Sequence, residues 1–129
     1  MKHTTPEIVD IPPEMREKML THRKEHANDP LGGVADRVIF EDDKVRIWDM
    51  NLEPGQFSAL HRHDHDYYLV IQSGDYVAAV LPEGGPTDMY LCKVPPQGNT
   101  VAVPKGETEW AYNAGKETYS EYLIELKNT

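Results

Sequence analysis

The chain has 129 residues, 39% of them hydrophobic and 27% charged, which is the size and composition of one globular domain with a single core. Its formal net charge is −9, and its basic residues do not cluster outside residues 16–24. Because nucleic-acid binding needs clustered Lys and Arg, we expect a small-molecule partner and no nucleic-acid partner.

The cysteine content and the apolar runs indicate the compartment. Cys92 has no second cysteine with which to form an internal disulfide, as is usual in a reducing compartment. No run approaches the roughly 18 apolar residues that a membrane-spanning helix needs. Residues 1–12 also lack the apolar stretch of a signal peptide. We therefore expect a cytoplasmic protein without a membrane partner.

Residues 13–27 predict one short amphipathic helix. They contain helix formers and no Gly, two prolines stand where a first turn tolerates them, and Met15 and Met19 lie on one stripe. The segment 26–33, HANDPLGG, then ends the helix with Asn, Asp, Pro and two Gly. We expect residues 1–35 to form an N-terminal arm that carries this helix.

From residue 36 onward, the pattern changes to short β-type runs that are separated by turn residues. The runs lie at 37–41, 45–52, 56–63, 67–73, 76–82, 89–94, 100–104, 109–113 and 118–126. About eight to ten strands at this spacing predict an all-β sandwich or barrel. The run 76–82, YVAAVLP, is almost wholly apolar, so we expect both of its faces to be covered.

The densest group of metal-binding side chains is the segment 61–67, HRHDHDY, which holds three of the six histidines. Residues two apart in a strand point to the same face, so His61 and His63 present two imidazoles to one side. This arrangement suits a divalent transition metal. A solvated strand face is the alternative interpretation of such a pair.

The two histidines belong to a longer pattern. It reads Gly55, five residues, His61, one, His63, three, Tyr67, six, Gly74. This spacing resembles the first metal-site motif of the cupin family, in which a Glu stands at the position of Tyr67.

A second pattern follows downstream. It reads Gly98, five residues, Pro104, one, Gly106, two, Glu109, three, Asn113. It resembles the second cupin motif, in which a His stands at the position of Glu109. Pro104 and Gly106 also have a structural role, because they form a tight turn that sets the register of the next strand.

The resemblance to small single-domain cupins covers most of residues 37–127. It implies an all-β fold, a double-stranded β-helix or jelly-roll barrel at residues 36–129, preceded by the short N-terminal helix. In the family, the barrel mouth holds a metal bound by two His and a Glu from the first motif and one His from the second. By position, this implies His61 and His63 as metal ligands.

The two departures from the motifs still allow a metal site. His61, His63 and Glu109 make a two-His-one-carboxylate set, which binds Fe(II) and tolerates Mn, Ni or Zn. Tyr67 is a poor ligand while protonated, and we predict it as a catalytic hydrogen-bond donor or acid. The alternative for Glu109 is a structural carboxylate that pairs with Arg62 or another cation.

Other residues near the motifs have two interpretations each. His65 is a second candidate for proton transfer, or a third imidazole ligand if the strand runs unbroken, whereas a DHD turn would direct it to solvent. Ala111 shares the face of Glu109, and Tyr119 or Glu121 is expected to line a pocket with Gln56.

A rival metal motif lies in the predicted helix. The segment His22-Arg23-Lys24-Glu25-His26 fits the H-x-x-E-H pattern, and two His four apart share a helix face. The stretch is basic and the chain is too short for a protease domain, so a solvated helix face is the ordinary interpretation.

Three functions remain open from the sequence. The first is a metal-dependent small-molecule enzyme, for which the cupin resemblance implies an oxygenase, lyase or isomerase. The second is a metal-free acid–base enzyme of the epimerase type, and the third is a non-catalytic domain that binds a small ligand. We also expect a homodimer, because the apolar run 76–82 would gain from being covered.

Overall fold

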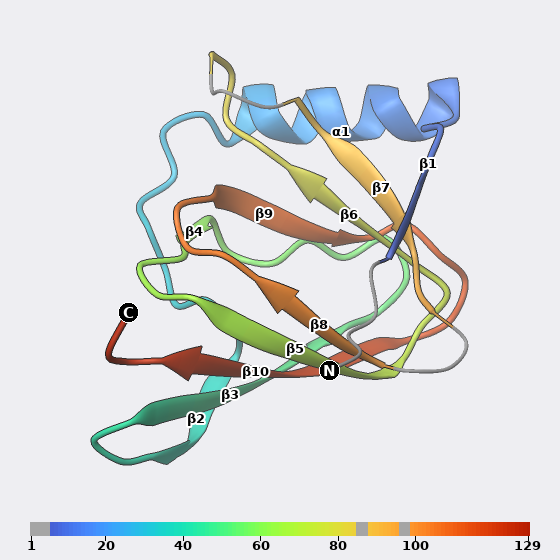
Figure 1. Cartoon of the computed structure of the whole chain (residues 1–129). Coiled ribbons are helices and arrows are strands. Elements are labelled where there is room, and N and C mark those ends of the chain that lie inside the picture. Colours follow the sequence, from blue (N-terminus) through green and yellow to red (C-terminus); the bar gives the residue numbers. More distant parts are fainter. Residues whose placement is uncertain (1–5, 85–87, 96–98) are drawn as a thin grey trace.

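Ten strands form two facing antiparallel sheets in the computed structural model, which describes residues 6–84, 88–95 and 99–129 (Figure 1). The first sheet has the order β1 (Glu7–Val9), β7 (Tyr90–Lys93), β6 (Tyr76–Val80), β9 (Thr108–Asn113) and β4 (His61–Arg62). The second has the order β2 (Arg37–Glu41), β3 (Val45–Leu52), β10 (Tyr119–Leu126), β5 (Tyr67–Ser73) and β8 (Thr100–Val103). The second-motif residue Gly98 lies outside the described residues.

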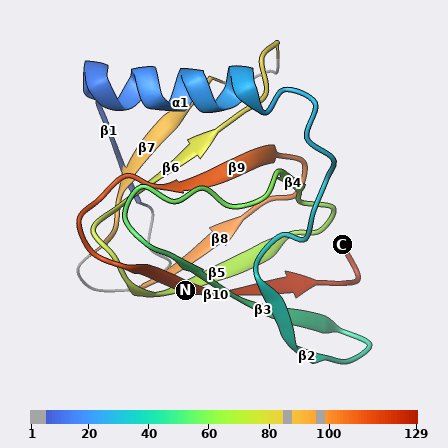
Figure 2. The same ribbon diagram turned by 180° about the vertical axis from the view of Figure 1, so that it is seen from behind.

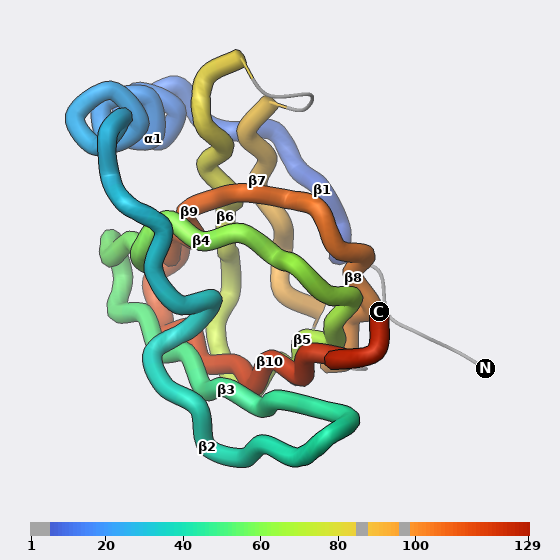
Figure 3. Tube along the Cα trace, turned by 90° about the vertical axis from the view of Figure 1, so that its left-hand side faces the viewer, coloured from blue at the N-terminus to red at the C-terminus, as the bar shows by residue number. Residues whose placement is uncertain are grey.

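The expected N-terminal helix is α1 (Pro13–Glu25), and it lies outside the first sheet (Figures 2 and 3). Pro13 occupies the first turn, where proline costs no hydrogen bond, and the helix ends where the backbone N–H of His26 bonds the carbonyl of His22 at 2.9 Å. Among the described residues, no helix is long and apolar enough to cross a membrane.

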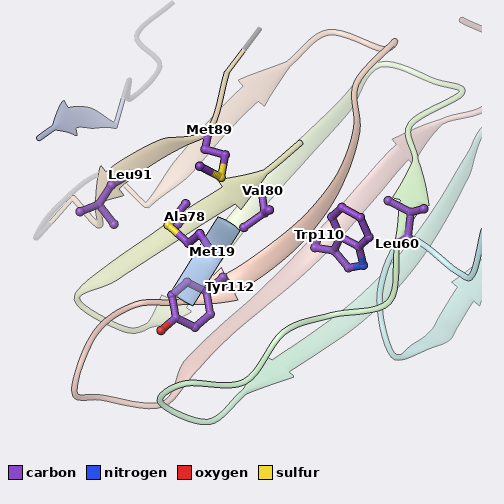
Figure 4. Packing of buried hydrophobic residues seen from close by; sticks show 8 residues of the cluster. All are labelled: Met19, Leu60, Ala78, Val80, Met89, Leu91, Trp110 and Tyr112. Atoms are coloured by element: carbon purple, nitrogen blue, oxygen red, sulfur yellow. The ribbon is translucent and has the colours of Figure 1, made fainter. Parts of the chain in front are cut away.

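Helix α1 is attached to the sheet through a buried hydrophobic cluster (Figure 4). Met19 is fully buried, and it is the residue of α1 that belongs to this buried cluster. The cluster consists of Met19, Leu60, Ala78, Val80, Met89, Leu91, Trp110 and Tyr112. Because side chains alternate along a strand, Trp110 and Tyr112 of β9 face the helix, whereas Glu109 and Ala111 face the space between the sheets.

The apolar run 76–82 is covered on both faces, as its composition predicts. Ala78 and Val80 pack in the cluster beneath α1, while Val77 and Ala79 line the cavity between the sheets. The helix therefore covers the surface from which we expected a homodimer. The homodimer stays a prediction, and it requires another surface.

The N-terminal arm is joined to the barrel by backbone hydrogen bonds. Strand β1 pairs with β7 at the edge of the first sheet, with Ile8 opposite Cys92. After the helix, the N–H of Gly32 donates to the carbonyl of Leu60 at 2.7 Å. A Cβ at Gly32 would lie 2.9 Å from the Cβ of Ala59, so glycine permits this close approach.

Truncation of Met19 tests how strongly the helix stabilises the barrel. Met19→Ala removes a fully buried side chain from the cluster, and we expect it to lower the free energy of unfolding by about 2–5 kcal/mol. Leu20→Ala is the matched control, because Leu20 lies on the same helix but is 39% exposed. Urea unfolding of both variants measures the difference. An equal loss in the two variants would contradict the assigned packing.

Candidate metal centre

The two cupin-like motifs meet where β4 pairs with β9. In this antiparallel register, His61 lies directly opposite Glu109. The pairing extends beyond β4, because the N–H of His63 donates to the carbonyl of Glu107 at 2.9 Å, and the N–H of Gly106 donates to the carbonyl of His63 at 2.9 Å. Gly106 has a φ of +121°, which favours glycine. The turn of the second motif thus fixes the backbone of a first-motif histidine.

Three side chains converge at this pairing. The Nε2 atoms of His61 and His63 lie 3.6 and 3.5 Å from Oε1 of Glu109. The side chains of His61 and His63 are each 2% exposed, and that of Glu109 is 12% exposed. One ligand atom from each residue lies within 4.8 Å of the other two, so the group can hold a metal ion.

The spacing of these atoms fits a divalent transition metal. Two ligand atoms that are each about 2.0–2.2 Å from one ion lie about 3.0–4.4 Å apart, and the two distances to Glu109 fall in this range. The second carboxylate oxygen of Glu109 is buried without a hydrogen-bond partner among the described residues. An ion that the carboxylate binds through both oxygens would also provide the partner that Oε2 lacks.

The ring of His61 is held in an orientation that suits metal binding. Its Nδ1 lies 2.9 Å from the carbonyl oxygen of Ala59. A carbonyl oxygen only accepts hydrogen bonds, so Nδ1 carries a proton and Nε2 is the nitrogen directed at Glu109. Burial lowers the pKa of His61, but Glu109 and the Ala59 carbonyl outweigh that effect and raise it, so an ion would bind Nε2 in place of a proton. Metal-bound histidines in proteins usually have such a second partner.

Two glutamates near the centre, Glu109 and Glu107, have pKa values shifted in opposite directions. Burial raises the pKa of Glu109, but the neighbouring His61, His63 and Glu107 outweigh that effect, and the pKa lies well below its ordinary value. Burial and the nearby Glu109 raise the pKa of Glu107 to about 8. The Tyr90 hydroxyl donates to Oε1 of Glu107 at 2.6 Å. Glu109 is therefore ionised at neutral pH, and Glu107 holds a proton.

Glu107 and Tyr90 did not follow from the motifs, although strand alternation could have found both. Glu107 stands two residues before Glu109 and so shares its side of the chain. Tyr90 stands two residues before Cys92, and both line the cavity. Neither residue belongs to a spacing pattern, so no motif in the sequence points to them.

Tyr67 lies beside the metal group but is not a member of it. Its ring stacks on that of His63, with centroids 4.0 Å apart and an interplanar angle of 15°. Burial raises the pKa of the Tyr67 phenol, and Glu109 and Glu121 raise it further. The residue at the usual Glu position is therefore a protonated phenol that lines the cavity beside the centre.

Two other residues of the HRHDHDY segment point elsewhere. Nδ1 of His65 lies 3.3 Å from the carbonyl oxygen of Thr129, and His65 is not among the residues that line the cavity. Its predicted role in proton transfer stays a prediction. Arg62 does not pair with Glu109, because its Nε donates to Oδ1 of the exposed Asp64 at 2.7 Å.

The rival H-x-x-E-H motif has its rings stacked. His22 stacks on His26 with centroids 4.1 Å apart, and on Phe57 with centroids 3.6 Å apart. Nδ1 of His26 lies 3.0 Å from Oδ2 of Asp29. Such stacking is typical of aromatic side chains that pack against one another. His22 and His26 do not belong to the group of converging ligand atoms, which His61, His63 and Glu109 form.

The group of His61, His63 and Glu109 opens onto a cavity of about 320 Å³ between the two sheets. This volume is in the range of small-molecule sites. Most of its wall is apolar and comes from Val34, Met50, Leu69, Ile71, Val77, Ala79, Val101, Val103, Ala111 and Leu123. Ala111 lines the cavity as expected. Gln56 does not, because it is exposed and its Oε1 accepts a hydrogen bond from the N–H of Glu53.

Both alternatives considered for the last strand, Tyr119 and Glu121, line the cavity. They are two residues apart on β10 and therefore share its inner face. The Tyr119 hydroxyl donates to Oε1 of Glu121 at 2.7 Å, and burial raises the pKa of Glu121 to about 7. The cavity thus has a second polar group in its apolar wall.

Solved structures similar to this chain include cupins. A cupin domain from Bordetella pertussis has a TM-score of 0.62 and 20% identity, over 76% of this chain and 97% of that chain. An RmlC-like cupin family protein with a double-stranded β-helix fold from Methanocaldococcus jannaschii has a TM-score of 0.51 and 18% identity, over 74% of this chain and 93% of that one.

A third similar structure is an uncharacterized conserved protein with a double-stranded β-helix domain from Klebsiella pneumoniae, with a TM-score of 0.53 and 22% identity, over 81% of this chain and 86% of that chain. No family model and no curated protein matches the sequence. The chain therefore has the cupin fold, a double-stranded β-helix with one short N-terminal helix, as the two motifs predicted. At these identities, similarity establishes the fold, and function has to be argued from the site.

The raised pKa of Glu121 predicts a pH-dependent stability. Unfolded Glu121 loses its proton near the ordinary value of 4.5, whereas the folded group keeps it to about pH 7. Between these values the unfolded state binds fewer protons, so stability falls as pH rises. Relative to Glu121→Gln, we expect the wild type to lose up to about 3 kcal/mol between pH 5 and pH 8.

Urea unfolding of both proteins at pH 5 and pH 8 measures this difference. Glu107 is present in both proteins, so its own titration cancels in the comparison. A difference between wild type and variant that does not change with pH would contradict the raised pKa of Glu121.

Proposed function

We propose that the chain is a metal-dependent enzyme that acts on a small molecule, with a divalent ion held by His61, His63 and Glu109. The observation that carries this proposal is the convergence of the three side chains at the wall of a mostly apolar cavity. A cavity of about 320 Å³ suits a small-molecule substrate.

The donor set favours certain ions. Two imidazoles and one carboxylate suit Fe(II), Mn, Ni or Zn, and three protein ligands leave positions open for substrate oxygen atoms. When bound, the ion supplies Lewis-acid polarisation of such an oxygen. Ionised Glu109 offsets part of the charge of the ion, and the hydrogen bond between His61 and Ala59 keeps Nε2 directed at the site.

The surrounding side chains are mostly apolar, and some of them hold protons. An apolar wall strengthens electrostatic interactions at the centre, because it screens charges less than water does. Tyr67 keeps its proton on the phenol oxygen and stacks on a ligand, so it can donate a hydrogen bond to a substrate beside His63. Because the raised pKa makes the phenol a weak acid, we propose Tyr67 as a catalytic hydrogen-bond donor.

The contact between His63 and Tyr67 also favours a second candidate, metal-free acid–base catalysis by this pair. The two proposals make opposite predictions for chelation. Turnover of a substrate that survives exhaustive chelation, and is lost in both His63→Ala and Tyr67→Phe, would support the metal-free enzyme.

Metal titration of the chelated, untagged protein tests the metal site. We expect the wild type to bind one equivalent of Zn²⁺, and Glu109→Gln to lower the affinity by at least 10- to 100-fold, because it removes the anionic ligand. Isothermal titration calorimetry measures both values. Less than a tenth of an equivalent bound in the wild type with each of Fe, Mn, Ni and Zn would overturn the proposal.

His65→Ala completes this experiment and also tests the role predicted for His65. The imidazole lies against Thr129 and not in the cavity wall, so we expect this variant to bind zinc like the wild type. A loss as large as that of Glu109→Gln would show that His65 moves into the site as a ligand.

The variant Tyr67→Phe distinguishes a catalytic role of Tyr67 from a role as metal ligand. The phenol is protonated and stacked on His63, so the variant should keep its zinc affinity within about threefold and should lose catalysis if Tyr67 is the catalytic hydrogen-bond donor. The Fe(III)-loaded wild type should likewise lack the visible charge-transfer band of a tyrosinate ligand. Appearance of that band, and its absence in the variant, would instead make Tyr67 a ligand.

A further inference from the structure

Two buried glutamates on the inner face of β10 have different surroundings. Glu125 is 6% exposed, accepts a hydrogen bond from the indole N–H of Trp48 and lies 3.7 Å from the guanidinium of Arg46. Glu121 is 4% exposed and has one hydrogen bond, from the hydroxyl of Tyr119. The hydrogen bond and the ion pair of Glu125 compensate for the cost of burying its carboxylate, whereas the single hydrogen bond of Glu121 does not.

The second oxygen of Glu121 has no partner. Within the described part of the chain, Oε2 is buried without a hydrogen bond, and no cation lies within 4.0 Å of the carboxyl group. Its partners across the two neighbouring strands are Met50 and Ile71, which offer no polar side-chain group. An unsatisfied buried polar atom of this kind costs about 1–3 kcal/mol, so its presence on a cavity wall needs a reason.

The orientation of Glu121 is fixed by a packed neighbour. Tyr119 is 1% exposed, and a Cβ at Gly74 would lie 2.8 Å from Cδ1 of its ring. Gly74 has a φ of +122° and closes the first motif, so the glycine that makes the turn also leaves room for the ring. The hydroxyl of the held ring then positions one oxygen of Glu121 and leaves the other free.

We infer that Glu121 is a second substrate-binding group of the cavity, positioned by Tyr119 and separate from the metal ligands. This inference rests on the proposed metal site and names the class of substrate. The substrate is a mostly apolar small molecule with two oxygen groups, one that binds the ion beside His61 and His63, and a hydroxyl or carbonyl that bonds Glu121. The apolar wall between them accommodates the hydrocarbon part.

The carboxyl group makes this site selective. A substrate that lacks the second oxygen leaves the Glu121 oxygen unpaired, and such sites reject the incomplete ligand strongly. In a protein without the carboxyl group, the same substrate oxygen would be buried against apolar side chains, and the preference would disappear or reverse.

A matched series of ligands tests this inference on the zinc-loaded protein. The probes are straight-chain carboxylates of three to eight carbons, whose carboxylate can bind the ion, and the corresponding ω-hydroxy carboxylates. Calorimetry gives the dissociation constant of each pair for the wild type, Glu121→Gln and Glu121→Met. For at least one chain length, we expect the wild type to bind the hydroxy acid at least fivefold more tightly than the plain acid.

The variants decide whether Glu121 causes that preference. Glu121→Gln keeps a hydrogen-bonding side chain and should retain part of it, whereas Glu121→Met should lose it while still binding one equivalent of zinc. Full preference in Glu121→Met, or no preference at any chain length in zinc-loaded wild type, would overturn the inference. Failure of the wild type to bind zinc would overturn the proposed function and the inference built on it.

Discussion

The candidate site depends on one interaction, the antiparallel pairing of β4 with β9. This register sets His61 opposite Glu109, and the backbone bonds of His63 to Gly106 and Glu107 continue it past the end of the strand. Because side chains two apart share a face, a shift by one residue would direct Glu109 away from both histidines. The glycine and turn residues of the second motif matter for this reason, since they hold the register.

Strand β9 also connects the site to the helix. Trp110 and Tyr112 pack with Met19 on its outer face, while Glu109 and Ala111 lie on its inner face. Helix packing and site geometry are therefore built on the same six residues of chain, Thr108–Asn113. This arrangement explains how β9 can hold a carboxylate in a fixed place, because its outer face is anchored in the buried hydrophobic cluster.

The sequence predicted the fold class, the helix and the grouping of His61, His63 and Glu109. Strand spacing places the two histidines on one face, whereas the resemblance to the cupin motifs implied the barrel and the position of Glu109. It did not predict features that depend on tertiary packing. The 56–63 run forms only the two-residue β4, and Gln56 points to solvent, since strand length depends on the partner strand. The pairing of β10 with β5 shifts its register between Ser120 and Glu121, which periodicity does not reveal, so the sequence alone did not show that Tyr119 and Glu121 both line the cavity.

An ordinary motif match would have supplied all four ligands, whereas here the usual Glu and His positions hold Tyr67 and Glu109. We propose that one ion nevertheless binds between the two motifs. Anomalous diffraction from crystals grown with Zn²⁺ tests this proposal. We expect one strong peak about 2.0–2.2 Å from Nε2 of His61 and His63 and from a carboxylate oxygen of Glu109. A map without that peak, or with zinc at the stacked pair His22 and His26 instead, would contradict it.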